Sequence, residues 1–181
     1  KRERKHVTLV HKTNVLTFAG DLWQRAFNIV AAEYPNVGTA YNHVDAACIY
    51  FVQDPHRYDV IVTDNLFGDM LSDVAAMLTG SLGMLPSASL GEADRQGKRK
   101  AMYEPVHGSA PDIAGRGLAN PIGQIWCGAM MLEFLGHKEA HDAILAAIEK
   151  VLLPGSGAPK TPDIGGNAST SDLGRAIAQA L

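Results

Sequence analysis

The feature that most constrains this fold is the alternation of short apolar runs with longer amphipathic segments. A β-branched run at residues 7–10 precedes a polar loop and a helix-like segment at residues 21–34. Four side chains of that segment share one helical face: Leu22, Ala26, Ile29 and Val30. An extended run at residues 37–43, a helix at 45–53 and a strand at 58–63 follow. Strands that alternate with helices predict an α/β fold with a parallel sheet.

The second half of the chain carries a different pattern. Residues 80–91 are rich in Gly, Ser and Pro and mark the predicted domain junction, which divides the chain into domains 1–79 and 80–181. A short strand at 101–103 leads into a loop at 104–120 that is too rich in Gly and Pro to be a mere linker. Three helices are expected after this loop, at residues 121–135, 138–153 and 171–181, with Ser171 or Thr170 capping the last.

Composition limits the classes of partner. The 181 residues are 46% hydrophobic and 19% charged, with a formal net charge of −3. No overall basic field therefore exists to bind a nucleic acid or an anionic membrane. No apolar run reaches the roughly 20 residues that a membrane span needs. Cys48 and Cys127 lie in apolar surroundings and predict free thiols of a reducing compartment, with the cytoplasm as the expected location.

A helix-like stretch at residues 66–78 carries the strongest chemical signal. Asp69 and Asp73 are four residues apart, so a helix points them from one face, where two carboxylates repel unless a cation neutralises them. Such hard oxygen ligands suit Mg²⁺ or Mn²⁺. The stretch follows the apolar strand at 58–63, and ligands collect at the carboxyl ends of strands in parallel sheets. A solvated acidic face is the alternative interpretation.

Further candidate groups lie in two loops and one helix. In the loop at residues 103–115, glycines and free backbone amides can wrap a phosphate or an adenosine, and Asp112 can accept both hydroxyls of a ribose. An acidic residue there favours NAD over NADP, and a structural loop is the alternative. Lys12 can carry a proton or bind an anion, unless it is a solvated surface charge. Asp45 is either a helix cap or a metal ligand.

Four motifs in this order resemble the β-decarboxylating dehydrogenases of the isocitrate/isopropylmalate dehydrogenase family. They lie at residues 12–14, 44–46, 65–73 and 104–115 and read KTN, VDA, NLFGDMLSD and EPVHGSAPDIAG. The resemblance implies a two-domain α/β fold with a mixed sheet, of which this chain is the C-terminal half. Residues 1–79 would form the second half of the small, dimer-forming domain, and residues 80–181 the C-terminal half of the large, NAD-binding domain.

The resemblance also implies roles for individual residues. It implies NAD as cofactor, together with Mg²⁺ or Mn²⁺ held by Asp69 and Asp73, while Asp45 comes from the other subunit of a homodimer. Lys12, which would come from the same neighbouring subunit, would help to move the hydroxyl proton of the substrate. Lys12 and Asp45 are the two predicted catalytic residues. The remaining assignments are to the NAD site: Asn14, Glu104, His107, Gly108, Ser109, Ala110, Asp112, Ile113 and Asn120.

The expected reaction is the NAD-dependent oxidative decarboxylation of a small 2-hydroxy acid. Residues 78–91 are most similar to family members that act on 3-isopropylmalate in leucine biosynthesis. Residues 120–126 and 161–166 are more similar to the tartrate and D-malate branch, and a non-catalytic regulatory subunit of the same fold is a third alternative. The chain opens without an initiator Met and has no counterpart of the family's arginine cluster and catalytic tyrosine, so we expect an N-terminal half to supply them.

Overall fold

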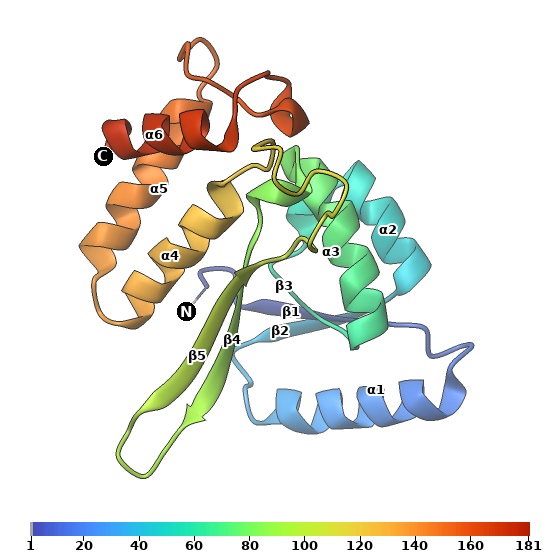
Figure 1. Ribbon diagram of the computed structural model, residues 1–181. Coiled ribbons are helices and arrows are strands. Elements are labelled where there is room, and N and C mark those ends of the chain that lie inside the picture. Colours follow the sequence, from blue (N-terminus) through green and yellow to red (C-terminus); the bar gives the residue numbers. More distant parts are fainter. Residues whose placement is uncertain (1) are drawn as a thin grey trace. The chain divides into compact units, whose positions relative to one another are not determined.

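The computed structural model describes residues 2–181 (Figure 1). Internal contacts divide the chain between Leu78 and Thr79 into two compact units, which we call unit 1 and unit 2. The boundary expected from the sequence lies one residue later. Each unit has its own apolar core and is described by itself.

Unit 1 is a three-stranded parallel sheet with helices on both faces. The strands are β1 (His6–His11), β2 (Gly38–His43) and β3 (Val60–Val62), in the spatial order β2-β1-β3. Its helices are α1 (Thr17–Ala32), α2 (Val44–Gln53) and α3 (Asn65–Thr79). Figure 1 shows α1 on one face of the sheet, and α2 and α3 on the other. The central strand therefore pairs on both sides with strands that come later in the chain.

The core of unit 1 lies between the sheet and two of its helices. Val10 of β1, Ala47 and Phe51 of α2, and Leu71 of α3 form its buried centre. A three-residue 3-10 turn, Pro55–Arg57, connects α2 to β3. The predicted strand at residues 58–63 is thus shorter in the structure.

Helix α1 presents a different face to the sheet than its apolar periodicity indicates. Gly20 is buried, and an added Cβ there would lie 2.7 Å from the Cα of Thr13, so the helix can approach the loop before it. Trp23, on the same side, places its ring 6.0 Å from the ring of His11. The side chains of Leu22 and Ile29 are 58% and 66% exposed. The helical face that was singled out from the sequence is therefore the outer one.

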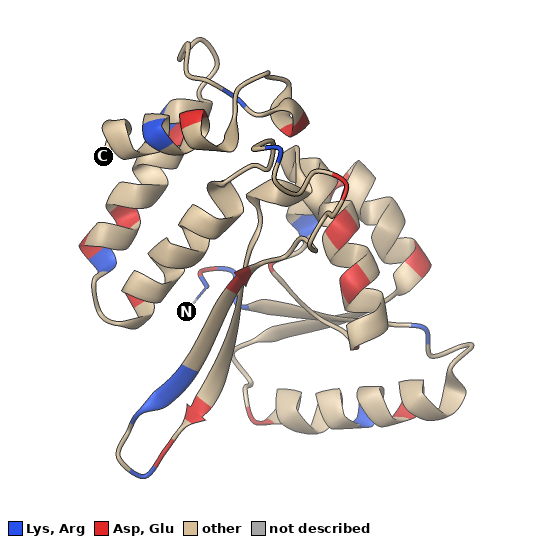
Figure 2. Cartoon of the chain, in the orientation of Figure 1, with Lys and Arg blue, Asp and Glu red and all other residues tan. Residues whose placement is uncertain are grey.

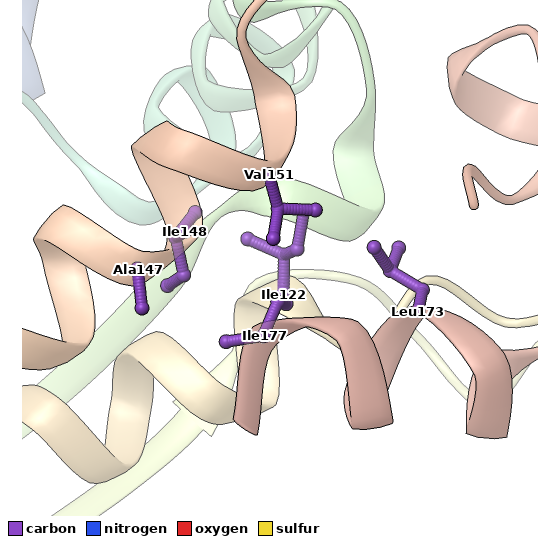
Figure 3. Packing of buried hydrophobic residues seen from close by; sticks show 6 residues of the cluster. All are labelled: Ile122, Ala147, Ile148, Val151, Leu173 and Ile177. Carbon is purple, nitrogen blue, oxygen red and sulfur yellow. The ribbon is translucent and has the colours of Figure 1, made fainter. Parts of the chain in front are cut away.

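Unit 2 combines an antiparallel strand pair with three helices. Strands β4 (Pro86–Ala93) and β5 (Arg99–Pro105) form the pair. Two 3-10 turns belong to the unit: Leu82–Met84 directly before β4, and Pro162–Ile164 between the last two helices. The helices are α4 (Ile122–Phe134), α5 (Lys138–Leu152) and α6 (Thr170–Ala180). Their buried side chains meet in one cluster, shown in Figure 3. Its members are Ile122, Ala147, Ile148, Val151, Leu173 and Ile177.

One local prediction for unit 2 was wrong, and one segment is more regular than expected. Residues 80–91 follow directly after the division at Leu78 and Thr79, and residues 86–91 form the first part of β4, which pairs with β5. The N-cap of α6 is Ser169, not Ser171 or Thr170. The hydroxyl of Ser169 accepts a hydrogen bond from the Asp172 amide, and the Asp172 carboxylate accepts one from the Ser169 amide, which is a complete capping box.

Both cysteines are free in the structure, with Cys127 buried and Cys48 partly buried. No helix within the described residues combines the length and hydropathy that crossing a bilayer requires.

Candidate functional site

In unit 1, polar residues follow the carboxyl ends of all three parallel strands. Lys12 comes directly after β1, Asp45 is the second residue of α2 after β2, and Asp64 lies two residues beyond β3. The register pairs His11 with His43, so β1 and β2 end level with each other. Parallel strands bring their carboxyl ends to one edge, and the sheet order places the later strands on either side of β1. Such a switch point is where open α/β sheets bind ligands.

Lys12 and Asp45 are joined at this edge. The ammonium Nζ of Lys12 lies 2.7 Å from Oδ1 of Asp45, with the Lys12 side chain 23% exposed and that of Asp45 67% exposed. The hydrogen bond from Lys12 is the main cause that lowers the pKa of Asp45 below its ordinary value. The contact therefore joins the end of β1 to the first turn of α2.

Asp64 belongs to the same edge, although sequence reasoning gave it no role. Its Oδ2 lies 3.0 Å from Nε2 of His11, whose side chain is 1% exposed. Its Oδ1 accepts a hydrogen bond of 3.0 Å from the amide of Phe67, in the first turn of α3. A histidine at the end of an apolar run, directly before Lys12, and an Asp-Asn pair before an apolar helix are the signals that could have identified this contact.

Helix α3 carries the predicted metal ligands. Asp69 and Asp73 are both exposed on α3, one helical turn apart, and Figure 2 shows this helix with its acidic positions in red. Within residues 2–181, neither carboxylate has an ion-pair partner. The pair fits Mg²⁺ or Mn²⁺, which take one or two carboxylates and fill the other positions with water and substrate oxygens.

One chain does not assemble a complete metal cage. In the described part of the chain, no three side chains of His, Cys, Asp or Glu come together in a way that could hold a metal ion. Asp45 is therefore not the third ligand beside Asp69 and Asp73 within one chain. Its assignment to a site shared between two subunits stays a prediction.

Unit 2 contains a cavity of about 900 Å³ bordered by the glycine-rich loop after β5. This volume lies within the range of about 300–1,000 Å³ that is usual for small-molecule sites. Six of the residues assigned to the NAD site line it: His107, Gly108, Ser109, Ala110, Ile113 and Asn120. The cavity also reaches Thr170 and Ser171, at the first turn of α6.

The backbone of this loop is shaped for close approach by a ligand. Ala110 has φ of 39°, a left-handed conformation that costs energy for a residue with a side chain. A Cβ added to Gly108 would meet nothing within 4 Å, so the backbone faces open space there. Two hydrogen bonds hold the far end of the loop to α6: Thr170 N donates to Gly117 O at 2.8 Å, and Thr170 Oγ1 donates to Ala119 O at 2.6 Å. The loop is thus fixed at its end and open along its middle.

Three of the assigned NAD residues lie outside this lining. Glu104 is exposed on β5, where it pairs with Ser87 of β4. Asp112 is exposed in the loop, next to Ile113 of the lining. Asn14 is exposed in unit 1, two residues after Lys12. Their roles stay predictions.

Asp163 is a lining residue that sequence reasoning did not select. Its Oδ2 accepts hydrogen bonds from Ser81 Oγ at 2.5 Å and from Asn120 Nδ2 at 2.9 Å. Burial alone would raise the pKa of this carboxyl, but the hydrogen bonds that it accepts, with that of Ser81 the largest, outweigh burial and the pKa is lowered. Asp163 stands in a TPDIGG run at residues 161–166, and an acidic residue in a loop segment rich in Pro and Gly is the signal that was available.

Comparisons with known proteins identify the family. The chain matches the family model of isocitrate/isopropylmalate dehydrogenase over residues 1–177. It is 54% identical over 162 residues to 3-isopropylmalate dehydrogenase of Nocardia farcinica, which covers 90% of this chain and 48% of that protein. It is 50% identical over 178 residues to 3-isopropylmalate dehydrogenase of Rhodococcus jostii, which covers 98% of this chain and 50% of that protein.

Two solved structures of similar fold are also isocitrate or β-decarboxylating dehydrogenases. Isocitrate dehydrogenase from Methylococcus capsulatus superposes with a TM-score of 0.86 at 42% identity, over 97% of this chain and 50% of that one. A β-decarboxylating dehydrogenase from Thermococcus kodakarensis superposes with a TM-score of 0.79 at 42% identity, over 97% of this chain and 49% of that one. The chain thus spans about half the length of the relatives that it matches. With its family motifs at the strand ends of unit 1 and along the cavity of unit 2, the chain belongs to the isocitrate/isopropylmalate dehydrogenase family.

Proposed function

We propose that this chain is the C-terminal half of an NAD-dependent, Mg²⁺- or Mn²⁺-dependent enzyme that oxidatively decarboxylates 3-isopropylmalate in leucine biosynthesis. The observation that carries the proposal is the pair Asp69 and Asp73, one turn apart on α3 and without an ion-pair partner among the described residues. Carboxylates that repel each other at this spacing are costly unless a cation is bound between them. Identities of 54% and 50% to 3-isopropylmalate dehydrogenases support the choice of substrate.

The residues of unit 1 would bind the acid and handle its proton. Asp69 and Asp73 would hold the metal, and Lys12, oriented by Asp45 at 2.7 Å, would hold or move the hydroxyl proton. When bound, the metal supplies Lewis-acid polarisation of substrate oxygens, and NAD⁺ accepts the hydride. Lys12 and Asp45 form one ion pair. In a homodimer with shared active sites, each subunit would therefore contribute both residues together to the active site of its partner.

The cavity of unit 2 would bind the dinucleotide. The open backbone at Gly108 and the fixed end of the loop at Thr170 leave room for the adenosine part, and Asp112 next to Ile113 would accept the ribose hydroxyls. The acidic side chain would repel the extra phosphate of NADP. This makes NAD the proposed cofactor.

The proposal includes the partner segments that the family resemblance implies. An N-terminal half of the same protein would complete both domains and supply the substrate-binding arginines and the catalytic tyrosine. The active form would be a homodimer, with no nucleic acid or membrane as partner. The free thiols of Cys48 and Cys127 suit the reducing conditions of the cytoplasm, where we place the enzyme.

The alternative substrates of the tartrate and D-malate branch rest on residues 120–126 and 161–166. In the structure, Asn120 and Asp163 of these two segments meet at the cavity proposed for the dinucleotide. We therefore propose that the likeness of these segments concerns the cofactor site, and the kinetic panel below tests the alternative acids directly. A regulatory subunit without chemistry is disfavoured because such a subunit would have no need of the Asp69 and Asp73 pair.

A kinetic panel on the full-length protein tests the proposal. We expect NAD⁺ reduction with 3-isopropylmalate to depend on Mg²⁺ or Mn²⁺, with kcat/KM higher than for D-malate, tartrate or isocitrate. A higher kcat/KM on D-malate would overturn the substrate assignment. No turnover on any of the four acids, with a folded dimer and metal present, would favour the regulatory subunit. The 181-residue chain alone is expected to be inactive.

A further inference from the structure

Three segments of unit 2 converge on one carboxylate oxygen. Oδ2 of Asp163 accepts hydrogen bonds from Ser81 Oγ at 2.5 Å and from Asn120 Nδ2 at 2.9 Å. Ser81 precedes the 3-10 turn Leu82–Met84, Asn120 ends the glycine-rich loop, and Asp163 belongs to the turn Pro162–Ile164. Asp163 is 82 residues from Ser81 and 43 from Asn120 in sequence. Bonds between such distant segments fix tertiary structure, not local structure.

Both residues that donate to Asp163 also accept a second hydrogen bond from within the protein. Ser81 Oγ accepts a bond of 3.0 Å from the amide of Gly83, and Asn120 Oδ1 accepts one of 2.9 Å from the amide of Ile122. Ser81 is 4% exposed and Asn120 is 7% exposed. The Asn120 side chain is thus bonded within the protein through both its amide nitrogen and its amide oxygen, which fixes its orientation in the lining of the cavity.

The packing around these bonds is tight. A Cβ added to Gly83 would lie 2.8 Å from the Cβ of Asn120 and 3.4 Å from Oδ2 of Asp163. All four residues, Ser81, Gly83, Asn120 and Asp163, line the 900 Å³ cavity. A displacement of any one segment would therefore change the wall of the cavity.

We propose that Asp163 is a positioning residue of the dinucleotide site. Through Ser81 and Asn120 it holds the Leu82–Met84 turn and the end of the glycine-rich loop in the spacing that admits the cofactor. It acts through these two residues and not on the reacting atoms. This inference rests on the proposed function, since it assigns the cavity to NAD.

The test compares two substitutions at Asp163 in the full-length protein. Asp163→Ala removes both acceptor bonds, whereas Asp163→Asn keeps one acceptor oxygen and the shape of the side chain. We expect Asp163→Ala to raise the KM and the directly measured Kd for NAD⁺ about tenfold. The kcat and the KM for the hydroxy acid should stay within about twofold of the unmodified protein, and Asp163→Asn should give an intermediate KM. The matched control is Asp142→Ala, which removes an exposed α5 carboxylate paired with Lys138 outside the cavity.

Amide hydrogen exchange provides a readout that does not require NAD. Exchange at Gly83 and Ile122, whose amides are bonded to Ser81 and Asn120, should accelerate in Asp163→Ala and not in Asp142→Ala. If exchange accelerates while the Kd for NAD⁺ is unchanged, Asp163 does not position the cofactor and the inference fails. If the unmodified protein binds no NAD⁺, the proposed function fails, and unchanged exchange would then also refute the structural role of Asp163. Should Asp163→Ala not fold, Ser81→Ala removes one of the two bonds and is expected to raise the Kd in the same direction.

Discussion

Nε2 of the buried His11 lies 3.0 Å from Oδ2 of Asp64, and the other oxygen of Asp64 accepts the amide hydrogen bond of Phe67. The end of β1 is thereby tied to the first turn of α3. The next residue after His11 is Lys12, which binds Asp45 at 2.7 Å. Two consecutive residues at the end of one strand therefore fix the starts of both helices that carry the candidate acidic groups.

We predict that His11→Leu lowers the free energy of unfolding of unit 1 by about 1–2 kcal/mol, because Asp64 loses its buried partner and holds α3 less firmly. Urea unfolding followed by Trp23 fluorescence, in a Trp126→Phe background, measures this change near the altered ring, since Trp23 packs against His11. His56→Leu is the matched control, since His56 is exposed in the same unit. Equal stability of the two variants would contradict a structural role for the contact.

We predict that Lys12→Met lowers kcat of the full-length enzyme by about 100-fold or more, because the group that handles the proton is lost. Lys138→Met serves as the control, since Lys138 also lies 2.7 Å from a carboxylate, that of Asp142, but on the exposed surface of α5. Its kcat should match that of the unmodified enzyme. A similar kcat for Lys12→Met would remove Lys12 from the proposed chemistry.

The same substitution should change the titration of Asp45. Because the hydrogen bond from Lys12 lowers the pKa of Asp45, Lys12→Met should raise that pKa toward the ordinary value. The folded pKa lies below the unfolded one, so the ion pair favours the native state above the unfolded pKa and loses this effect as the pH falls through the folded pKa. Carboxyl carbon chemical shifts followed against pH measure the change. A titration of Asp45 that is unchanged by the substitution would show that the pair does not persist in solution.

We predict that Asp69→Asn raises the apparent dissociation constant for Mg²⁺ at least about tenfold. Without metal, the same substitution should leave stability equal or higher by about 0.2–0.5 kcal/mol, because it relieves repulsion from Asp73 one turn away. Metal titration and thermal unfolding with and without Mg²⁺ measure the two effects. Asp21→Asn, on α1 of the same unit and paired with Arg25 at 2.8 Å, should change neither the metal affinity nor kcat. A loss of stability in metal-free Asp69→Asn would indicate that Asp69 is structural.

We predict that Leu173→Ala lowers the free energy of unfolding of unit 2 by about 2–5 kcal/mol, because it opens a cavity in the cluster of Figure 3. Leu173 is 0% exposed, whereas Leu135 is 62% exposed. Leu135→Ala should therefore cost less than about 0.5 kcal/mol. Denaturant unfolding followed by Trp126 fluorescence distinguishes the two outcomes.

The order of strands and helices was predictable because it depends on local periodicity. The helix that carries Asp69 and Asp73 begins at Asn65, within one residue of its expected start. The apolar face of α1 that periodicity locates is exposed in the structure, because periodicity does not tell which surface covers a face. Gly20 is buried instead, and its lack of a side chain permits this, since an added Cβ would lie 2.7 Å from the Cα of Thr13.

The sequence by itself determined the alternation of elements, the helical spacing of the two aspartates, the glycine-rich loop and the family. Each of these features depends on residues that lie close together along the chain. The tertiary structure alone decided that His11 meets Asp64, that Lys12 meets Asp45, and that Ser81, Asn120 and Asp163 share one oxygen. These contacts join residues between 33 and 82 positions apart. Their geometry depends on how parallel strands and packed helices bring distant segments together, and no local pattern encodes that.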